Sequence, residues 1–198
     1  MPRKPRPHPA VPAPGPANRS PGVHFLSAHA VIRQLIRSSG VGPGDLVIDF
    51  GAGPGTLTAP LAATGARVLA IERDEAFVRK LNRRFADQPL VRVVHADLRT
   101  VPLPSRDFSV VANIPFALST VLLRRLLSRP RRALAGADLV VEWGFAQRVV
   151  AAQSTETAAW AQKYEMRVAR RIAANCFRPA PRVDSAHLVI RRCRHRTS

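Results

Sequence analysis

The sequence predicts an α/β fold built on an open sheet of mainly parallel strands. Short apolar runs rich in valine and isoleucine recur along the chain, as buried parallel strands require. Segments with apolar residues at helical spacing lie between these runs. Glycine-rich or polar residues follow several of the runs directly, at the strand ends where open α/β sheets bind their ligands.

Length and composition limit the possible classes of protein. The chain has 198 residues, enough for one sizeable domain, and its 46% hydrophobic content can furnish a core. A net charge of +18 favours a polyanionic partner such as nucleic acid, with an acidic membrane surface as the competing explanation. No apolar stretch approaches the roughly 18–20 residues of a membrane span. We expect a soluble cytoplasmic protein.

The two cysteines, Cys176 and Cys193, have neither a CxxC spacing nor a His/Cys ligand pattern. This argues against a disulfide scaffold and against a zinc site, so we expect no metal.

The first 21 residues alternate proline with basic residues and alanine and contain no acid. Proline at this density blocks helix and sheet alike, which predicts a disordered basic tail over residues 1–21 and a folded domain over residues 22–198. The tail is either an arm that contacts phosphates or a dispensable leader.

The first predicted helix leads to a strand and a glycine-rich loop. Apolar residues from Ala28 to Ile36 fall at helical spacing, with Ser27 as the expected N-cap and Gly40 as the stop. The apolar run at residues 46–50 then reads as a buried strand, and Gly51-Ala52-Gly53-Pro54-Gly55 follows it at once.

This loop favours a cofactor without a pyrophosphate. Its spacing is G-x-G-x-G with Asp49 two positions before it, whereas pyrophosphate sites use G-x-G-x-x-G. S-adenosylmethionine is the leading candidate, because its aminocarboxypropyl arm must pass close to the backbone. Glu72 ends the next apolar run, where a carboxylate can take ribose hydroxyls. Nicotinamide and flavin proteins use similar loops, and the glycines could also be simple turn formers.

A third acid continues this pattern. A basic amphipathic helix is predicted over residues 74–85, and the strand at residues 91–95 precedes Asp97 and Leu98. Asp97 could accept the amine of an adenine, although a lone loop Asp is more often a turn or cap residue. The recurrence of an acid at three successive strand ends, Asp49, Glu72 and Asp97, favours the binding role.

The fourth strand, at residues 108–112, ends in Asn113-Ile114-Pro115-Phe116. Proline lacks an N–H and fixes φ, so we expect the two carbonyl groups around it to be held in set directions without local donors. Asn113 adds an amide and Phe116 a flat face, which together suit a planar base with an exocyclic amine. Acceptors around such an amine stabilise the positive charge that develops when it attacks carbon. The alternative is an ordinary strand end with a core phenylalanine.

The remaining chain continues the same alternation. Ser119 or Thr120 is expected to cap a helix, a basic loop covers residues 129–132, and a fifth strand covers residues 139–142. Trp143 and Phe145 could stack on bases or pack in the core. Two last strands, at residues 165–172 and 186–191, flank a proline-stiffened loop.

In this order, the motifs resemble those of the Erm-type 23S rRNA adenine N6-methyltransferases and of the small-subunit rRNA adenine dimethyltransferases. The resemblance covers nearly the whole chain after the tail, and the Glu142 to Arg148 block with Ile114 favours the Erm branch. The segments that carry it are His24-Phe25-Leu26, Asp49 to Gly55, Glu72, Asp97, Asn113 to Phe116, Ser119-Thr120, Glu142 to Arg148 and Phe177 to Ser185.

The resemblance implies a Rossmann-like, seven-stranded S-adenosylmethionine-dependent methyltransferase fold. The protein would act without metal, as a monomer with 23S rRNA as its partner. The methyl would go in line to N6 of an adenine, giving macrolide, lincosamide and streptogramin B resistance. Asn113, Ile114, Pro115 and Phe116 would hold the flipped adenine. The residues implied to bind the cofactor are His24, Leu26, Gly51, Gly53, Gly55, Glu72, Asp97, Leu98 and Asn113.

The chain departs from the family pattern in two ways. His24 stands where the family usually has Asn, and Val23 where it usually has Gln. The sequence also stops before the small helical C-terminal domain that assists RNA binding in the family, so target choice and affinity are expected to differ.

Other functions stay open at this point. A small-subunit rRNA dimethyltransferase or a DNA adenine methyltransferase would use the same residues. A basic RNA-binding factor could retain the fold without the chemistry.

Overall fold

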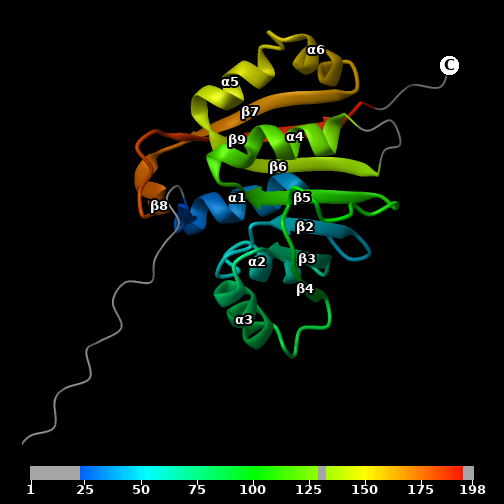
Figure 1. Cartoon of the computed structure of the whole chain (residues 1–198), viewed down its shortest axis with the longest axis vertical. Coiled ribbons are helices and arrows are strands. Elements are labelled where there is room, and N and C mark those ends of the chain that lie inside the picture. The colour runs from blue at the N-terminus through cyan, green and yellow to red at the C-terminus, as the bar shows by residue number, and fades with distance from the viewer. Residues whose placement is uncertain (1–22, 129–132, 194–198) are drawn as a thin grey trace, which may run out of the picture.

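The computed structural model describes residues 23–128 and 133–193, which form one α/β domain (Figure 1). The predicted tail over residues 1–21 and the basic loop over residues 129–132 lie outside the described residues. The elements follow in the order β1 (Phe25–Leu26), α1 (His29–Ser39), β2 (Leu46–Phe50), α2 (Thr58–Ala62), β3 (Arg67–Glu72), α3 (Glu75–Arg84), β4 (Val91–His95), β5 (Phe108–Asn113), η1 (Phe116–Leu118), α4 (Ser119–Leu127), β6 (Leu134–Glu142), α5 (Trp143–Val150), α6 (Thr155–Ala161), β7 (Tyr164–Ile172), η2 (Ala174–Cys176), β8 (Phe177–Arg178) and β9 (Ser185–Arg192).

The main sheet has seven strands in the order β4-β3-β2-β5-β6-β9-β7. The first five strands are parallel to one another, and β9 runs antiparallel to both β6 and β7. The chain builds outward from β2 to β4 and then returns to place β5 on the other side of β2. This reversal of strand order is the topological switch point, where sheets of this kind bind ligands.

Helices cover both faces of the sheet, as Figure 1 shows for α1 and α4. Alternation along each strand decides which core a side chain joins. Ile48 and Val110 face the larger core with the leucines of α4, whereas Val47 and Val111 face the other core with Leu35 of α1. The strands are therefore buried on both faces, which explains why they read as continuous apolar runs.

A small second sheet ties the two ends of the domain together. Phe25 pairs with Arg178 and Leu26 with Phe177, antiparallel. This pairing brings β1 beside a loop about 150 residues later in the chain, since Ser27 N and the Cys176 carbonyl are bonded at 2.8 Å. The two-residue strands carry no sequence signal of their own.

The N-caps predicted from the sequence for two helices are wrong. Helix α1 begins after Ala28, and the Ser27 hydroxyl donates to the Cys176 carbonyl oxygen instead of capping it. Helix α4 begins at Ser119 with Leu118 at the N-cap position, and no side chain caps it. Before α1 the segment is held by hydrogen bonds to Cys176, and before α4 the chain enters the helix from the 3-10 turn η1, so neither helix uses the expected cap. Gly40 does end α1, with a left-handed φ of 64°.

A buried ionic cluster joins the sheet to α1. Asp138 on β6, only 1% exposed, accepts a hydrogen bond from His187 Nε2 at 2.8 Å and forms an ion pair with Arg191 Nη2 at 2.7 Å. Arg191 also donates to the Ser38 carbonyl oxygen near the end of α1, at 2.5 Å. The carboxylate thus neutralises a cation that fastens the helix to the sheet.

No helix in the described ranges combines the length and apolar character needed to cross a bilayer. Within the same residues, no group of three His, Cys, Asp or Glu side chains is arranged to hold a metal ion.

Replacing Asp138 with alanine is expected to lower the free energy of unfolding by about 3 kcal/mol, because a buried charge pair loses one partner. Urea denaturation measures the change. Asp107→Ala is the control, since Asp107 pairs with Arg192 but its side chain is 71% exposed, and its loss should cost about 1 kcal/mol or less. Equal costs for the two variants would contradict the structural role of the cluster.

Candidate active site

The candidate site lies at the carboxyl ends of β2 and β5, on either side of the switch point. The glycine loop continues β2, and Asn113 is the last residue of β5. A Cβ atom placed on Gly51 would lie 3.9 Å from Pro115 Cδ and 4.0 Å from the Asn113 carbonyl oxygen. Two motifs that begin 62 residues apart in the sequence, at Gly51 and Asn113, therefore lie next to each other.

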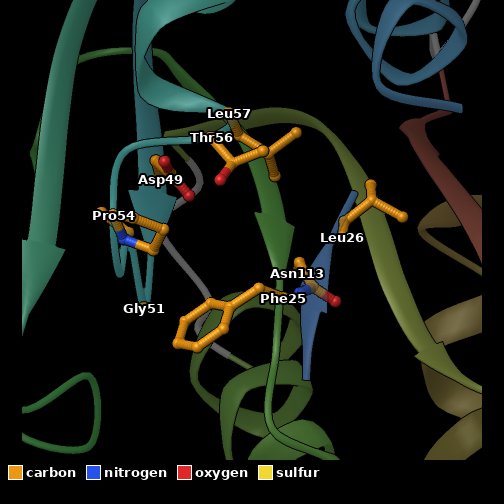
Figure 2. Close-up of a pocket in the computed structure, with 9 residues that line it drawn as sticks. Phe25, Leu26, Asp49, Gly51, Pro54, Thr56, Leu57 and Asn113 are labelled. Atoms are coloured by element: carbon orange, nitrogen blue, oxygen red, sulfur yellow. The ribbon is translucent and has the colours of Figure 1, made fainter. Parts of the chain in front are cut away.

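A pocket opens between these two segments (Figure 2). The pocket has an empty volume of about 270 Å³, including its open mouth. The ring of Phe25 projects into the space between the glycine loop and Asn113. The lining residues are Phe25, Leu26, Asp49, Gly51, Ala52, Pro54, Thr56, Leu57 and Asn113.

Glycines in the loop allow a positive φ and leave room for neighbouring groups. Gly53 has a φ of +52°, and a Cβ there would lie 2.9 Å from Cε1 of Phe25, so both the backbone and the ring exclude a side chain. Gly51 has a φ of +69° but no contact that close, so it leaves the pocket open toward Asn113. Gly55 closes the turn beside Phe85.

Glu72, at the end of β3, holds the glycine loop in place. Its Oε2 accepts a hydrogen bond from Gly53 N at 2.8 Å, and its Oε1 accepts from the N–H groups of Arg73 and Asp74. Only 8% of the residue is exposed. A carboxylate has about four acceptor positions, so these three bonds leave capacity for a further donor such as a hydroxyl.

Asp49 lies beneath the loop and is 1% exposed. The Thr58 hydroxyl donates to its Oδ2 at 2.7 Å. Burial raises the pKa of Asp49 to about 7, and the nearby Glu72 adds to the effect while the Thr58 hydroxyl opposes it. A carboxylate with such a pKa can change its charge when a cation binds in the pocket.

Asp97 and Leu98, which follow β4, do not line the pocket. Arg99 binds the Asp97 carboxylate with Nε at 3.0 Å and Nη2 at 2.6 Å, which lowers the pKa of Asp97 to about 2. Leu98 is buried, and its carbonyl oxygen accepts a hydrogen bond from Arg125. Of the three acids at strand ends, the structure brings only Asp49 and Glu72 to the glycine loop.

The residues from Asn113 to Phe116 form a corner at the end of β5, called the catalytic corner below after the role that the sequence predicts for it. Nδ2 of Asn113 donates to the His24 carbonyl oxygen at 2.7 Å, which fixes the amide orientation. Among the described residues, Asn113 Oδ1 and the Ile114 carbonyl oxygen accept no hydrogen bond. The Pro115 carbonyl oxygen accepts from Leu118 N at 2.8 Å, so the expectation that it lacks a local donor is wrong. Phe116 is half-buried.

The structure places the other sequence candidates around this corner. The His24 ring lies 6.1 Å from the Phe116 ring, and Leu26 lines the pocket. Trp143 and Phe145 pack against the main core, and the Arg171 guanidinium lies 5.1 Å from the Trp143 ring, which favours packing over base stacking.

Sequence reasoning assigned no role to several residues at the site, of which Phe25 and Thr58 make the most specific contacts. Phe25 lines the pocket and contacts Phe77 edge to face, with ring centroids 5.4 Å apart. Thr58 supplies the hydroxyl for Asp49. A phenylalanine at a chain entry and a threonine at the start of a helix are common in any fold, so no local signal identified them.

Comparisons with known proteins identify related chains. A family model described as "Ribosomal RNA adenine dimethylase" matches residues 16–198. The chain is 32% identical over 173 residues to an rRNA adenine N-6-methyltransferase of Bacillus licheniformis, covering 86% of this chain and 60% of that protein. It is 36% identical over 175 residues to a protein of the same name from Corynebacterium diphtheriae, covering 86% and 67%.

Among solved structures, the 23S rRNA methyltransferase ErmE superimposes with a TM-score of 0.79 at 26% identity, over 85% of this chain and 70% of that one. This likeness confirms the predicted α/β methyltransferase fold. The chain spans about 60% of the length of the Bacillus relative, so the two proteins are compared over a shared part only.

Replacing Asp49 with asparagine is expected to remove a pH dependence of stability. The folded-state pKa of about 7 lies above the unfolded value of 3.8, so wild-type stability falls as pH rises between these values. The asparagine variant does not share this fall. Its stability relative to wild type should therefore grow by about 1 kcal/mol or more over that range, as measured by denaturant unfolding at several pH values.

Asp97→Asn is the control for this experiment. The pKa of Asp97 is lowered to about 2, so its contribution to stability is lost only as the pH falls below the ordinary value of 3.8. A stability difference between Asp49→Asn and wild type that stays constant with pH would show that Asp49 is not held protonated by burial.

Proposed function

The chain belongs to the ribosomal RNA adenine dimethylase family, and on that premise we propose that it methylates the exocyclic N6 of an adenine in 23S rRNA. The methyl donor is S-adenosylmethionine, and the modification confers resistance to macrolide, lincosamide and streptogramin B antibiotics. The protein acts in the cytoplasm, as a monomer on ribosomal RNA.

One observation carries the proposal: the glycine loop and the catalytic corner meet. A Cβ on Gly51 would come within 4.0 Å of the Asn113 carbonyl oxygen, so a cofactor on the loop and a base at the corner would lie side by side. A transfer reaction needs this short approach, because the reacting atoms must come within about 3–3.5 Å of each other.

The residues at the loop fit the proposed cofactor. Gly51 and Gly53 present a backbone without side chains, Glu72 retains acceptor capacity for ribose hydroxyls, and the buried Asp49 suits a cationic group. When bound, S-adenosylmethionine supplies an electrophilic methyl group on a sulfonium. A cation beside Asp49 would favour the charged form of its carboxylate and lower its pKa.

The catalytic corner supplies the groups for the amine. Asn113 Oδ1 and the Ile114 carbonyl oxygen accept its two hydrogens and direct the nitrogen lone pair away from the ring. Their dipoles also stabilise the positive charge that develops on nitrogen. Extruding the base costs about a few kcal/mol of unstacking free energy. Phe116 stacks on the extruded base and offsets part of this cost. The methylated amine is acidic enough to lose its proton to water, so no general base is required.

Basic side chains near the site suit an RNA substrate. Arg178 and Arg182 are exposed in and after β8, which pairs with β1 directly after His24. Together with the net charge of +18, they favour binding of the phosphate backbone, which should weaken as salt increases.

Methyl incorporation into isolated 23S rRNA, 16S rRNA and DNA tests the proposal, with primer extension to locate the modified nucleotide. The proposal expects label in an adenine of 23S rRNA. Label in 16S rRNA would instead support a small-subunit dimethyltransferase, a role consistent with the description of the matched family. RNA binding without cofactor binding in calorimetry would indicate a binding factor that has lost the chemistry.

Asn113→Ala is expected to reduce the methylation rate at least about tenfold, equivalent to about 1.4 kcal/mol, because one acceptor for the amine is lost. Cofactor affinity should change little, as calorimetry with S-adenosylmethionine would show. Asn82→Ala, on the exposed face of α3, is the matched control and should retain the wild-type rate. An unchanged rate in Asn113→Ala would remove Asn113 from the mechanism.

Gly53→Ala is expected to weaken binding of S-adenosylmethionine by about tenfold or more, because the new Cβ meets Phe25 and distorts the loop. Gly44→Ala separates this effect from backbone strain, since Gly44 also has a positive φ of +88° but no atom lies within 4 Å of its Cβ position. Calorimetry should show wild-type affinity for Gly44→Ala. Equal affinities for both variants would contradict the placement of the cofactor on the loop.

A further inference from the structure

The last turn of α3 packs against the glycine loop. A Cβ atom on Gly55 would lie 2.9 Å from Phe85 Cε2 and 3.0 Å from Leu81 Cδ2, so two apolar side chains of this helix end fill the space that glycine leaves. Both side chains are buried, and Phe85 is the C-cap residue of α3. The loop is therefore supported by α3 as well as by Glu72 of the sheet.

Arg84, the last residue of α3, adds a polar contact to this packing. Its Nη1 donates a hydrogen bond to the Pro54 carbonyl oxygen at 2.7 Å. Pro54 stands between Gly53 and Gly55 and lines the pocket (Figure 2). The guanidinium carbon of Arg84 lies 5.3 Å from the centre of the Phe85 ring, and a cation is also favoured at the C-terminal end of a helix. These interactions hold the guanidinium against the loop.

The neighbouring arginines of α3 do not share this contact. Arg79 pairs with Glu75 on its own helix. Arg83 is exposed and forms no hydrogen bond or ion pair with any described residue. The bond to Pro54 is therefore a property of position 84 rather than of the basic face of α3 as a whole.

A loop of this composition gains from such a brace. Gly51, Gly53 and Gly55 have φ values of +69°, +52° and +82°, and glycine has many alternative conformations when it is not held. Ordering the loop as a ligand binds would cost conformational entropy and weaken the affinity. Contacts that order the loop beforehand reduce this cost.

We propose that Arg84 is a positioning residue for the cofactor, which bonds Pro54 and so keeps the glycine loop in the shape that S-adenosylmethionine binds. The inference rests on the proposed function. Arg84 is not among the residues that line the pocket, so it acts through the loop rather than by touching the cofactor. Its loss would lower the affinity for the cofactor and leave the chemical step unchanged, because the loop holds the cofactor equally before and during transfer.

Arg84→Met and Arg83→Met form a matched pair, since each removes one exposed cation from the same turn of α3 and keeps an apolar stem. In calorimetry with S-adenosylmethionine and without RNA, we expect the affinity of Arg84→Met to fall about fivefold or more. The affinity of Arg83→Met should stay within about twofold of wild type. Equal affinities for the two variants would overturn the proposal.

Arg84→Lys tests whether the hydrogen bond carries the effect. A lysine ammonium can donate to the same carbonyl oxygen, so this variant should return to within about threefold of the wild-type affinity. An Arg84→Lys variant as weak as Arg84→Met would show that the bond to Pro54 is not responsible. Denaturant unfolding should give similar midpoints for Arg84→Met and Arg83→Met. A lower midpoint for Arg84→Met with unchanged affinity would leave Arg84 a purely structural role and overturn the proposal.

Steady-state kinetics separate this role from a contact with RNA. The methylation rate of Arg84→Met at saturating cofactor should stay within about twofold of wild type, while the KM for S-adenosylmethionine rises about fivefold or more. A rise in the KM for RNA with unchanged cofactor affinity would show that Arg84 binds a phosphate instead, and would overturn the proposal.

Hydrogen exchange follows the loop itself and needs neither cofactor nor activity. Gly53 N donates to Glu72 and Gly55 N donates to the Ala52 carbonyl oxygen, both at 2.8 Å, so both amides are protected while the loop keeps its shape. Their exchange should be about fivefold or more faster in Arg84→Met than in wild type or Arg83→Met. Equal rates in wild type and Arg84→Met would overturn the proposal. Absence of methylation by the wild type would instead refute the proposed function, and the exchange rates would still test the brace.

Discussion

The contact between the ends of β2 and β5 is the constraint on which the site depends. These strands are neighbours only because the chain, after building β3 and β4 on one side of β2, returns to place β5 on the other. Parallel pairing of Val47 with Ser109 and of Ile48 with Val110 brings both carboxyl ends to the same edge. The glycine loop and Asn113 are thereby held together by the sheet itself, whose buried strands are the most rigid part of such a fold.

The three acids at strand ends show how one sequence pattern yields three physical states. Asp49 is buried with a raised pKa, Glu72 is occupied by main-chain N–H groups, and Asp97 is paired with Arg99 and has a lowered pKa. Their positions follow from the parallel sheet, but their protonation depends on neighbours that come from other segments or from loop conformation. Electrostatics at this edge is therefore a property of the tertiary structure rather than of the motif.

Much of the fold could be predicted from sequence because strands buried on both faces must be apolar and the intervening helices must be amphipathic. The glycine loop and the Asn113 segment could likewise be placed at strand ends. Contacts between distant segments could not be predicted: the pairing of β1 with β8, the Thr58 hydroxyl under Asp49, and the use of Ser27 to bind Cys176 instead of capping α1. In each case a common residue acquires its role only from a partner that is remote in the chain or supplied by a loop.

The central claim, that the glycine loop and the catalytic corner serve one reaction, is tested most directly by a crystal structure of the protein with S-adenosylhomocysteine and adenosine. The account predicts that the sulfur of S-adenosylhomocysteine lies beside Gly51 and that the adenine stacks on Phe116. The N6 amine of the adenine should donate a hydrogen bond to Asn113 Oδ1. The vacant methyl position would lie about 3–3.5 Å from N6. A sulfur directed away from Asn113, or an adenine bound elsewhere on the protein, would contradict it.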